Sequence, residues 1–212
     1  MPHADWYFDF ISPFAYLQHE ILHRLPDDLE ITFKPVVFSG LLNHWGHKGP
    51  AEIPGKRIFV FRQCKWWADR NKITYTLPPA HPFNPIKALR LAIALGCEAG
   101  AIETIFRFIW AEGRDIADDW PALAERFGMS AQEANDRVQA TEVKQALIAN
   151  GEAAIESGVF GVPTFVIDGE IIWGVDSTEM MADYLDNPAL FATEEMRRIL
   201  TTPAAAQRDG GG

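Results

Sequence analysis

The strongest constraint on this chain is the position of its strand patterns, which occur near its two ends. Apolar and polar side chains alternate over residues 6–10 and again over residues 29–33, the period of two that is typical of strands. Strand signals resume only at residues 163–173. Between them, from about Arg57 to Ser157, the pattern is helical throughout. A sheet must therefore be assembled from both ends of the chain around an inserted helical region.

The N-terminal part predicts a β-α-β unit. The first strand runs directly into Ser12-Pro13, a strong helix start, because serine can cap a free backbone N–H and proline is tolerated at the first helical position. The helix that follows carries an apolar stripe made of Phe14, Leu17, Ile21 and Leu25. Leu29, Ile31 and Phe33 then indicate a second strand, expected to be parallel to the first.

The remaining patterns place the other elements. Residues 39–56 contain four glycines and two prolines, which favours an irregular connection, and the helical region beyond them should hold five or six helices. Asn84 and Ser130 are the expected caps of two of these helices. Asp168-Gly169 predicts a type I′ hairpin between two antiparallel strands. Asp176 and the residues after it should cap a last helix that continues through Tyr184.

Composition excludes several classes of protein. The 212 residues carry a net charge of −10 with no dense basic run, which argues against nucleic acid as a partner. The acidic N-terminus does not resemble a signal peptide and no apolar run reaches membrane-spanning length, so we expect a cytoplasmic protein with no membrane partner. Cys64 and Cys97 match no CxxC or ligand spacing, and His44 and His47 lack a third ligand, so we expect no metal.

Three segments together resemble one family. They are Phe10-Ile11-Ser12-Pro13-Phe14-Ala15-Tyr16, Gly158-Val159-Phe160-Gly161-Val162-Pro163-Thr164 and Trp173-Gly174-Val175-Asp176. In order and spacing they resemble the 2-hydroxychromene-2-carboxylate isomerase family, which is grouped with kappa-class glutathione transferases and related to DsbA-like oxidoreductases.

The resemblance covers roughly residues 5–190 and implies an α/β, thioredoxin-like fold (β-α-β … β-β-α) with an all-helical insertion. Residues 1–56 and 158–200 would form a discontinuous thioredoxin-like domain and residues 57–157 the inserted helical domain. Residues 201–212 would be a mobile tail.

The resemblance also implies glutathione as the cofactor. Ser12 matches the serine whose hydroxyl stabilises the glutathione thiolate, and a hydroxyl donor at a positive helix end would lower the pKa of a thiol. On spacing alone, a role as a helix cap is favoured over a catalytic role for Ser12. The later motifs match the positions at which the family binds the rest of glutathione, which are here Val162, Pro163, Trp173, Gly174, Val175, Asp176 and Ser177.

Within that set the implied roles differ. The peptide before Pro163 would be cis, and the backbone of Val162 would pair with the cysteinyl part of glutathione as an added strand would. Asp176 and Ser177 would hold the γ-glutamyl end, although the same two residues also make a good capping pair. Trp173 would be a wall of the site or, equally, a buried aromatic that ends the hairpin.

A second substrate should lie between glutathione and the inserted helices, where Lys56, Phe83 and Asn84 are candidate contacts. His44, Trp45, Arg57 and Trp110 are further candidates. The family's lysine and asparagine for an aromatic carboxylate fall at Leu42 and Glu52 here, and Glu52 would oppose an anion. Lys48 or Lys56 could substitute for the lysine, because a cation on a flexible stem tolerates displacement.

The leading interpretation is a glutathione-dependent isomerase whose substrate is a small aromatic or unsaturated carbonyl compound. Two alternatives stay open: a kappa-like glutathione transferase, and a non-catalytic glutathione-binding protein of the same fold. A disulfide oxidoreductase is excluded because Ser12-Pro13-Phe14-Ala15 contains no cysteine. Relatives of this kind are usually homodimers, and we expect the same here.

Overall fold

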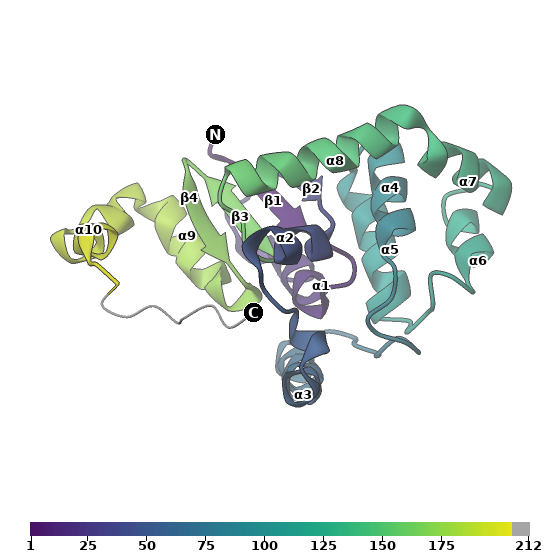
Figure 1. The fold of residues 1–212 in the computed structure, drawn as a ribbon, viewed down its shortest axis with the longest axis horizontal. Helices are drawn as coiled ribbons and strands as arrows, with labels where there is room; N and C mark the ends of the chain where they lie inside the picture. Colours follow the sequence, from purple (N-terminus) through teal and green to yellow (C-terminus); the bar gives the residue numbers. More distant parts are fainter. Residues whose placement is uncertain (205–212) are drawn as a thin grey trace.

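The strands from the two ends of the chain form one mixed sheet in the computed structural model, which describes residues 1–204. The strand order is β2-β1-β3-β4 (Figure 1). β1 (His3–Phe8) pairs in parallel with β2 (Glu30–Pro35) and antiparallel with β3 (Thr164–Ile167). β4 (Glu170–Trp173) pairs antiparallel with β3. The predicted parallel pair and the predicted closing hairpin are both confirmed.

Alternation along β1 separates two apolar clusters. Trp6 and Phe8 are fully buried on one face of the sheet, where their rings stack with centroids 4.8 Å apart. Tyr7 points to the opposite face and belongs to a second, smaller cluster. Because successive side chains of a strand point to opposite faces, an unbroken aromatic run can serve both sides of a central strand.

Helices cover both faces of the sheet (Figure 1). α1 (Pro13–His19) and α9 (Thr178–Asp186) contribute buried side chains to the cluster that contains Trp6. On the Tyr7 face, α2 (Phe38–Trp45) packs against α8 (Thr141–Glu156), which runs along the length of the molecule.

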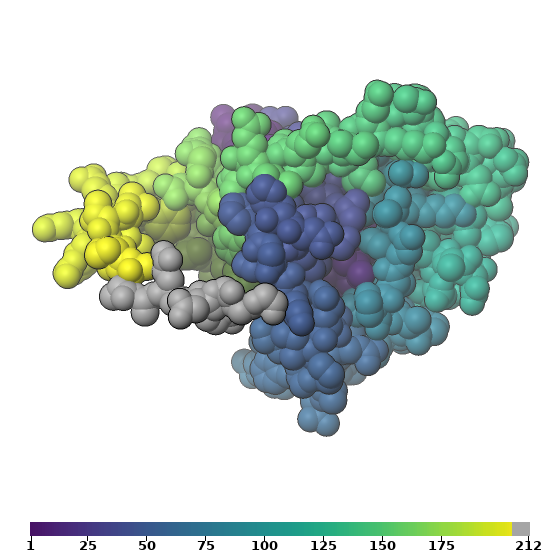
Figure 2. Space-filling model, in the orientation of Figure 1, coloured from purple at the N-terminus to yellow at the C-terminus, as the bar shows by residue number. Residues whose placement is uncertain are grey.

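The inserted region contains six α-helices, in agreement with the predicted five or six. They are α3 (Pro54–Asn71), α4 (Ile86–Ala94), α5 (Ala99–Trp110), α6 (Trp120–Glu125), α7 (Ala131–Gln139) and α8. Ser130 caps α7 as expected, accepting a hydrogen bond from the Glu133 N–H at 3.2 Å. In Figure 2, α3 is the blue segment that projects below the rest of the molecule.

The insertion shares its core with the sheet. The ring of Phe106 on α5 lies 4.6 Å from that of Phe10 and 5.5 Å from that of Phe8, between centroids. It also approaches Trp6 and Tyr16 at 6.2 Å. One aromatic cluster therefore ties α5 to both β1 and α1. The boundaries of the two proposed domains stay a prediction.

Residues 39–56 are not the irregular connection that their glycines predicted. They hold most of α2, a 3₁₀ turn (Pro50–Glu52) and the start of α3. Gly46 has φ of 65° and ends α2 in the left-handed region, where glycine is strongly favoured. The glycine that suggested a loop is in this case the end signal of a helix.

Three other boundaries differ from expectation. α1 ends at His19, and its apolar stripe continues through a 3₁₀ turn (Leu22–Arg24). Tyr184 does lie in α9, but a further 3₁₀ segment (Pro188–Ala192) and α10 (Glu194–Thr201) follow it. Thr201 thus closes a helix, and residues 205–212 of the predicted mobile tail lie outside the described residues. None of the helices within residues 1–204 is long and apolar enough to span a membrane.

Truncating the residue at the centre of the aromatic cluster should destabilise the whole protein. We expect Phe106→Ala to lower the free energy of unfolding by about 3–5 kcal/mol, because it removes a fully buried ring and leaves a cavity. Phe59→Ala is the matched control, since Phe59 is 62% exposed and its loss should cost less than about 0.5 kcal/mol. Urea unfolding of both variants checks this, and equal destabilisation would contradict the assignment.

Candidate functional site

The fold brings Ser12 beside Val162, a residue 150 positions away in sequence. Ser12 is 7% exposed, and its hydroxyl donates to the Val162 carbonyl at 3.4 Å between oxygens. The same Oγ accepts a hydrogen bond from the Ala15 N–H at 3.2 Å, so Ser12 is also the N-cap of α1. Capping and contact with the Val162 backbone therefore coexist in one side chain.

The Val162–Pro163 peptide is cis, as the resemblance implied. Both residues are buried. The Pro163 carbonyl accepts the Gly174 N–H at 2.9 Å, which joins this segment to the residue that follows β4. Gly174 has φ of 95°, a backbone conformation that residues with a side chain rarely adopt, so glycine is strongly favoured at this corner.

Gln18, which sequence analysis did not single out, holds the same corner from α1. Its fully buried amide donates to the Gly174 carbonyl at 3.0 Å and to Thr178 Oγ1 at 3.1 Å. Its carbonyl accepts the Trp6 indole N–H at 2.7 Å. Three bonds satisfy this amide, and they link β1, α1 and the start of α9.

Trp173 forms an exposed wall beside the cis peptide. It is 51% exposed, which excludes the alternative of a buried aromatic at the end of the hairpin. Its ring packs edge-on against Phe160 with centroids 5.2 Å apart. A Cβ atom on Gly161 would lie 2.7 Å from the indole nitrogen, so the indole lies directly against the backbone that precedes Val162.

Asp176 and Ser177 do not form the predicted capping pair. Ser177 Oγ donates to the Trp173 carbonyl at 2.7 Å, and it makes no cap bond to α9. Val175 is buried beneath them, whereas Asp176 is exposed. Asp176 borders a groove of about 250 Å³ that Arg24 and Glu179 also line. The Asp176 carboxylate therefore does not act as the helix cap that the spacing alone suggested.

Asp9 is a buried acid three residues before Ser12 that sequence analysis did not single out. Its two carboxyl oxygens accept the Ile11 N–H at 3.0 Å and the Phe38 N–H at 2.8 Å. Burial raises the pKa of this carboxyl from 3.8 to about 7, and the two backbone hydrogen bonds oppose that rise. A polar residue within the run Trp6-Tyr7-Phe8-Asp9-Phe10 was the available signal.

An aromatic segment lies on the insertion side of Ser12. The His81 ring contacts the Ile11 carbonyl through Nε2 at 2.9 Å, and Phe83 lies edge-on to His81 with centroids 5.9 Å apart. Phe83 is half-buried. The segment that contains Phe83, a predicted substrate contact, therefore lies against Ile11, the residue before Ser12.

The other predicted substrate contacts lie differently. Asn84 is exposed and its side-chain oxygen accepts the Ile86 N–H at 3.0 Å, the first N–H of α4. The N-cap residue of α4 is Pro85, so Asn84, the predicted cap, lies one residue before the cap position. Lys56 is exposed near the start of α3. Trp110 is fully buried, and its indole N–H donates to the Phe10 carbonyl at 2.8 Å. Trp110 is therefore a core residue, and the prediction that it lines the substrate site is wrong.

The Glu52 carboxylate accepts the Gly49 N–H at 2.6 Å.

Known proteins resemble this chain along most of its length. A family model described as the DSBA-like thioredoxin domain matches residues 4–186. The 2-hydroxychromene-2-carboxylate isomerase of Pseudomonas putida is 30% identical over 192 residues, covering 84% of this chain and 91% of that protein. Glutathione S-transferase kappa 1 of Homo sapiens is 26% identical over 203 residues, covering 86% and 90% respectively.

A solved structure supports the same fold. A structure of 2-hydroxychromene-2-carboxylate isomerase matches with a TM-score of 0.76 at 22% identity, covering 95% of this chain and 100% of that one. The expected thioredoxin-like fold with a helical insertion is confirmed.

The buried acid predicts an unusual pH dependence of stability. The unfolded chain releases the Asp9 proton near pH 3.8, whereas the folded protein keeps it to about pH 7. Stability should therefore fall as pH rises from about 4 to about 7, by up to about 4 kcal/mol from this group. In Asp9→Asn that contribution disappears.

The quantity to compare is the difference in the free energy of unfolding between the wild type and Asp9→Asn at each pH. Burial lowers the pKa of His19 from 6.5 to about 4. The contribution of this histidine to stability therefore increases as the pH rises through this range, opposite to the effect of Asp9. Urea unfolding of both proteins at pH 4.5, 6 and 7.5 measures the difference. If the two profiles run parallel, Asp9 does not hold its proton as described.

Proposed function

Because this chain belongs to the 2-hydroxychromene-2-carboxylate isomerase family of DsbA-like thioredoxin proteins, we propose that it is a glutathione-dependent isomerase. The observation that carries the proposal is the contact of the Ser12 hydroxyl with the carbonyl before the cis-proline, 3.4 Å away. The site's polar groups suit glutathione: a hydroxyl donor for a thiolate, a backbone edge for a peptide and an exposed carboxylate that can accept from an ammonium group.

Ser12 would bind and stabilise the sulfur. Rotating its O–H from the Val162 carbonyl toward a bound thiolate adds a hydrogen bond to an anion, which lowers the pKa of the thiol. Rotation also frees the Val162 carbonyl to accept the cysteinyl N–H. The two changes compensate each other, so the protein replaces one internal hydrogen bond with two to the ligand.

Bound glutathione supplies a nucleophilic thiolate that adds reversibly to an unsaturated carbonyl compound, allowing a bond to rotate before the thiolate is expelled. Phe83 would pack against an aromatic substrate from the insertion side of the site. Lys56 would attract a carboxylate of the substrate from the edge. The side-chain nitrogen of Asn84 has no hydrogen-bond partner within residues 1–204, while its oxygen accepts the Ile86 N–H, so this nitrogen would donate to the substrate.

At the other end of glutathione, Asp176 would receive the γ-glutamyl ammonium. Its carboxylate is exposed at the edge of the groove beside Glu179 and makes no ion pair within residues 1–204. Val162, Pro163, Trp173, Gly174, Val175 and Ser177 would shape the remainder of the proposed site. The proposed homodimer stays a prediction.

Removing the Ser12 hydroxyl should raise the pKa of the bound thiol without abolishing binding. We expect Ser12→Ala to bind glutathione while the pKa of its thiol rises by about 1–2, the value of one hydrogen bond to an anion. Calorimetric titration gives the affinity, and difference absorbance near 240 nm followed against pH reports the thiolate.

Ser130→Ala is the matched control, because Ser130 caps α7 in the same way but lies on the insertion, away from the proposed site. It should lose cap stability with no change in the thiolate signal. Absence of glutathione binding by the wild type at millimolar concentrations would overturn the proposal. Binding and thiolate formation without turnover of hydroxychromene-type acids or other electrophiles would instead identify a non-catalytic binding protein.

The charge at Asp176 should matter only for ligands that carry the γ-glutamyl group. We expect Asp176→Asn to weaken glutathione binding about three- to tenfold, because one partly exposed ion pair is lost. Binding of the dipeptide Cys-Gly, which lacks the γ-glutamyl group, should not change. Glu170→Gln removes another exposed acid, from β4, and serves as the charge control. Equal weakening of both ligands would refute the role of Asp176.

A further inference from the structure

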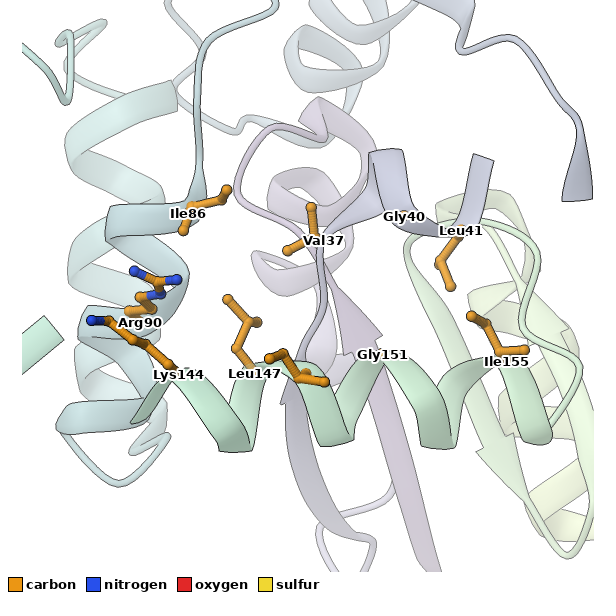
Figure 3. A pocket seen from close by; sticks show the side chains of 10 residues that line it. Val37, Gly40, Leu41, Ile86, Arg90, Lys144, Leu147, Gly151 and Ile155 are labelled. Carbon is orange, nitrogen blue, oxygen red and sulfur yellow. The ribbon is translucent and has the colours of Figure 1, made fainter. Parts of the chain in front are cut away.

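A second groove lies between α2, α4 and α8 (Figure 3). Its volume is about 230 Å³. None of the residues proposed to bind glutathione or its partner substrate is among the described residues that line it. Its walls are aliphatic, made by Val37, Leu41, Ile86, Leu147, Ile148 and Ile155.

Two cations stand at one end of this groove. Arg90 on α4 and Lys144 on α8 both line this end (Figure 3). Arg90 Nε is buried and has no hydrogen-bond partner in the described part of the chain. Neither side chain forms an ion pair within residues 1–204. In a chain with a net charge of −10, two neighbouring cations without an acidic partner are complementary to an anion.

Two glycines keep the groove open. Gly40 in α2 and Gly151 in α8 both line it, and a Cβ atom on either would meet no other atom within 4 Å. Glycine inside a helix costs about 1 kcal/mol relative to alanine. Neither close backbone approach nor a positive φ accounts for these two glycines. What their missing side chains provide is space along the groove.

We propose that this groove binds a small monocarboxylate with an aliphatic body. Arg90 and Lys144 would hold its carboxylate, and the wall from α2, α4 and α8 would cover its chain. Arg90 and Lys144 carry the only polar side chains among the described lining residues, so the ligand needs one anionic head and no other polar group. The volume, below the roughly 300 Å³ at which pockets for drug-sized ligands begin, selects a short chain.

Octanoate is the probe, titrated into the full-length protein by calorimetry. We expect saturable binding with one site per chain, and binding by 1-octanol or acetate at least about tenfold weaker. Lys144→Gln should weaken octanoate about tenfold and leave 1-octanol unchanged. The absence of saturable octanoate binding by the wild type would overturn the proposal.

Filling the groove tests its location. Gly151→Leu places a side chain in open space on α8 between Leu147 and Ile155, one turn away on either side, and leucine favours the helix over glycine. It should abolish octanoate binding while the melting temperature holds or rises. Gly100→Leu, at a second helical glycine with open space but away from the groove, should bind as the wild type does.

Other occupants give different results. Competition between octanoate and glutathione would place octanoate at the Ser12 site and overturn the second site. Conversion of a dimer to a monomer by Gly151→Leu, measured by sedimentation, would show that a second copy of the chain fills the groove. Failure of glutathione binding would leave this test intact, because the two proposed sites share no residue.

Discussion

The pairing of β1 with β3 is the constraint on which the rest of the molecule depends. In its register Tyr7 lies opposite Thr164, which sets the end of β1 beside the cis-proline and Ser12 beside Val162. A slip of one residue would turn Trp6 and Phe8 away from α5 and onto the opposite face of the sheet, where the smaller cluster around Tyr7 packs. The packing of the core and the position of Ser12 therefore follow from the same set of backbone hydrogen bonds.

Two buried polar side chains hold the loops around that register. Gln18 satisfies the Gly174 carbonyl, and Asp9 satisfies the backbone N–H groups of Ile11 and Phe38. An unpaired buried group would cost about 1–3 kcal/mol, so each bond penalises alternative loop positions. Asp9 connects the turn before α1 to the first residue of α2. The starts of α1 and α2 are thus joined through one carboxyl group.

Local patterns were sufficient for some elements and not for others. The aromatic alternation of residues 6–10 identified β1, although the strand spans His3–Phe8 and ends two residues before the alternation does. Asp168-Gly169 identified the hairpin, with both residues at positive φ. Gly46 misled because the same left-handed conformation serves a loop and a helix end.

Residues whose role depends on tertiary contacts could not be predicted from the sequence. Asp9, Gln18 and Phe106 owe their importance to partners distant in the chain, and no periodicity records which polar residue will be buried. Trp110 was taken for a lining residue for the same reason. The motifs around Ser12 and Val162 were informative because, in the family that they resemble, the matching residues lie in the same site.

The Ser12 hydroxyl has a further consequence for how the site could respond to a ligand. Its acceptor lone pair holds the Ala15 N–H while its hydrogen atom points to the Val162 carbonyl. These two functions use different parts of one hydroxyl group. Rotation about a single C–O bond is enough to redirect the hydrogen, and the cap on α1 stays in place throughout. The donor can switch partners on the timescale of a bond rotation, with no helix, strand or loop having to move.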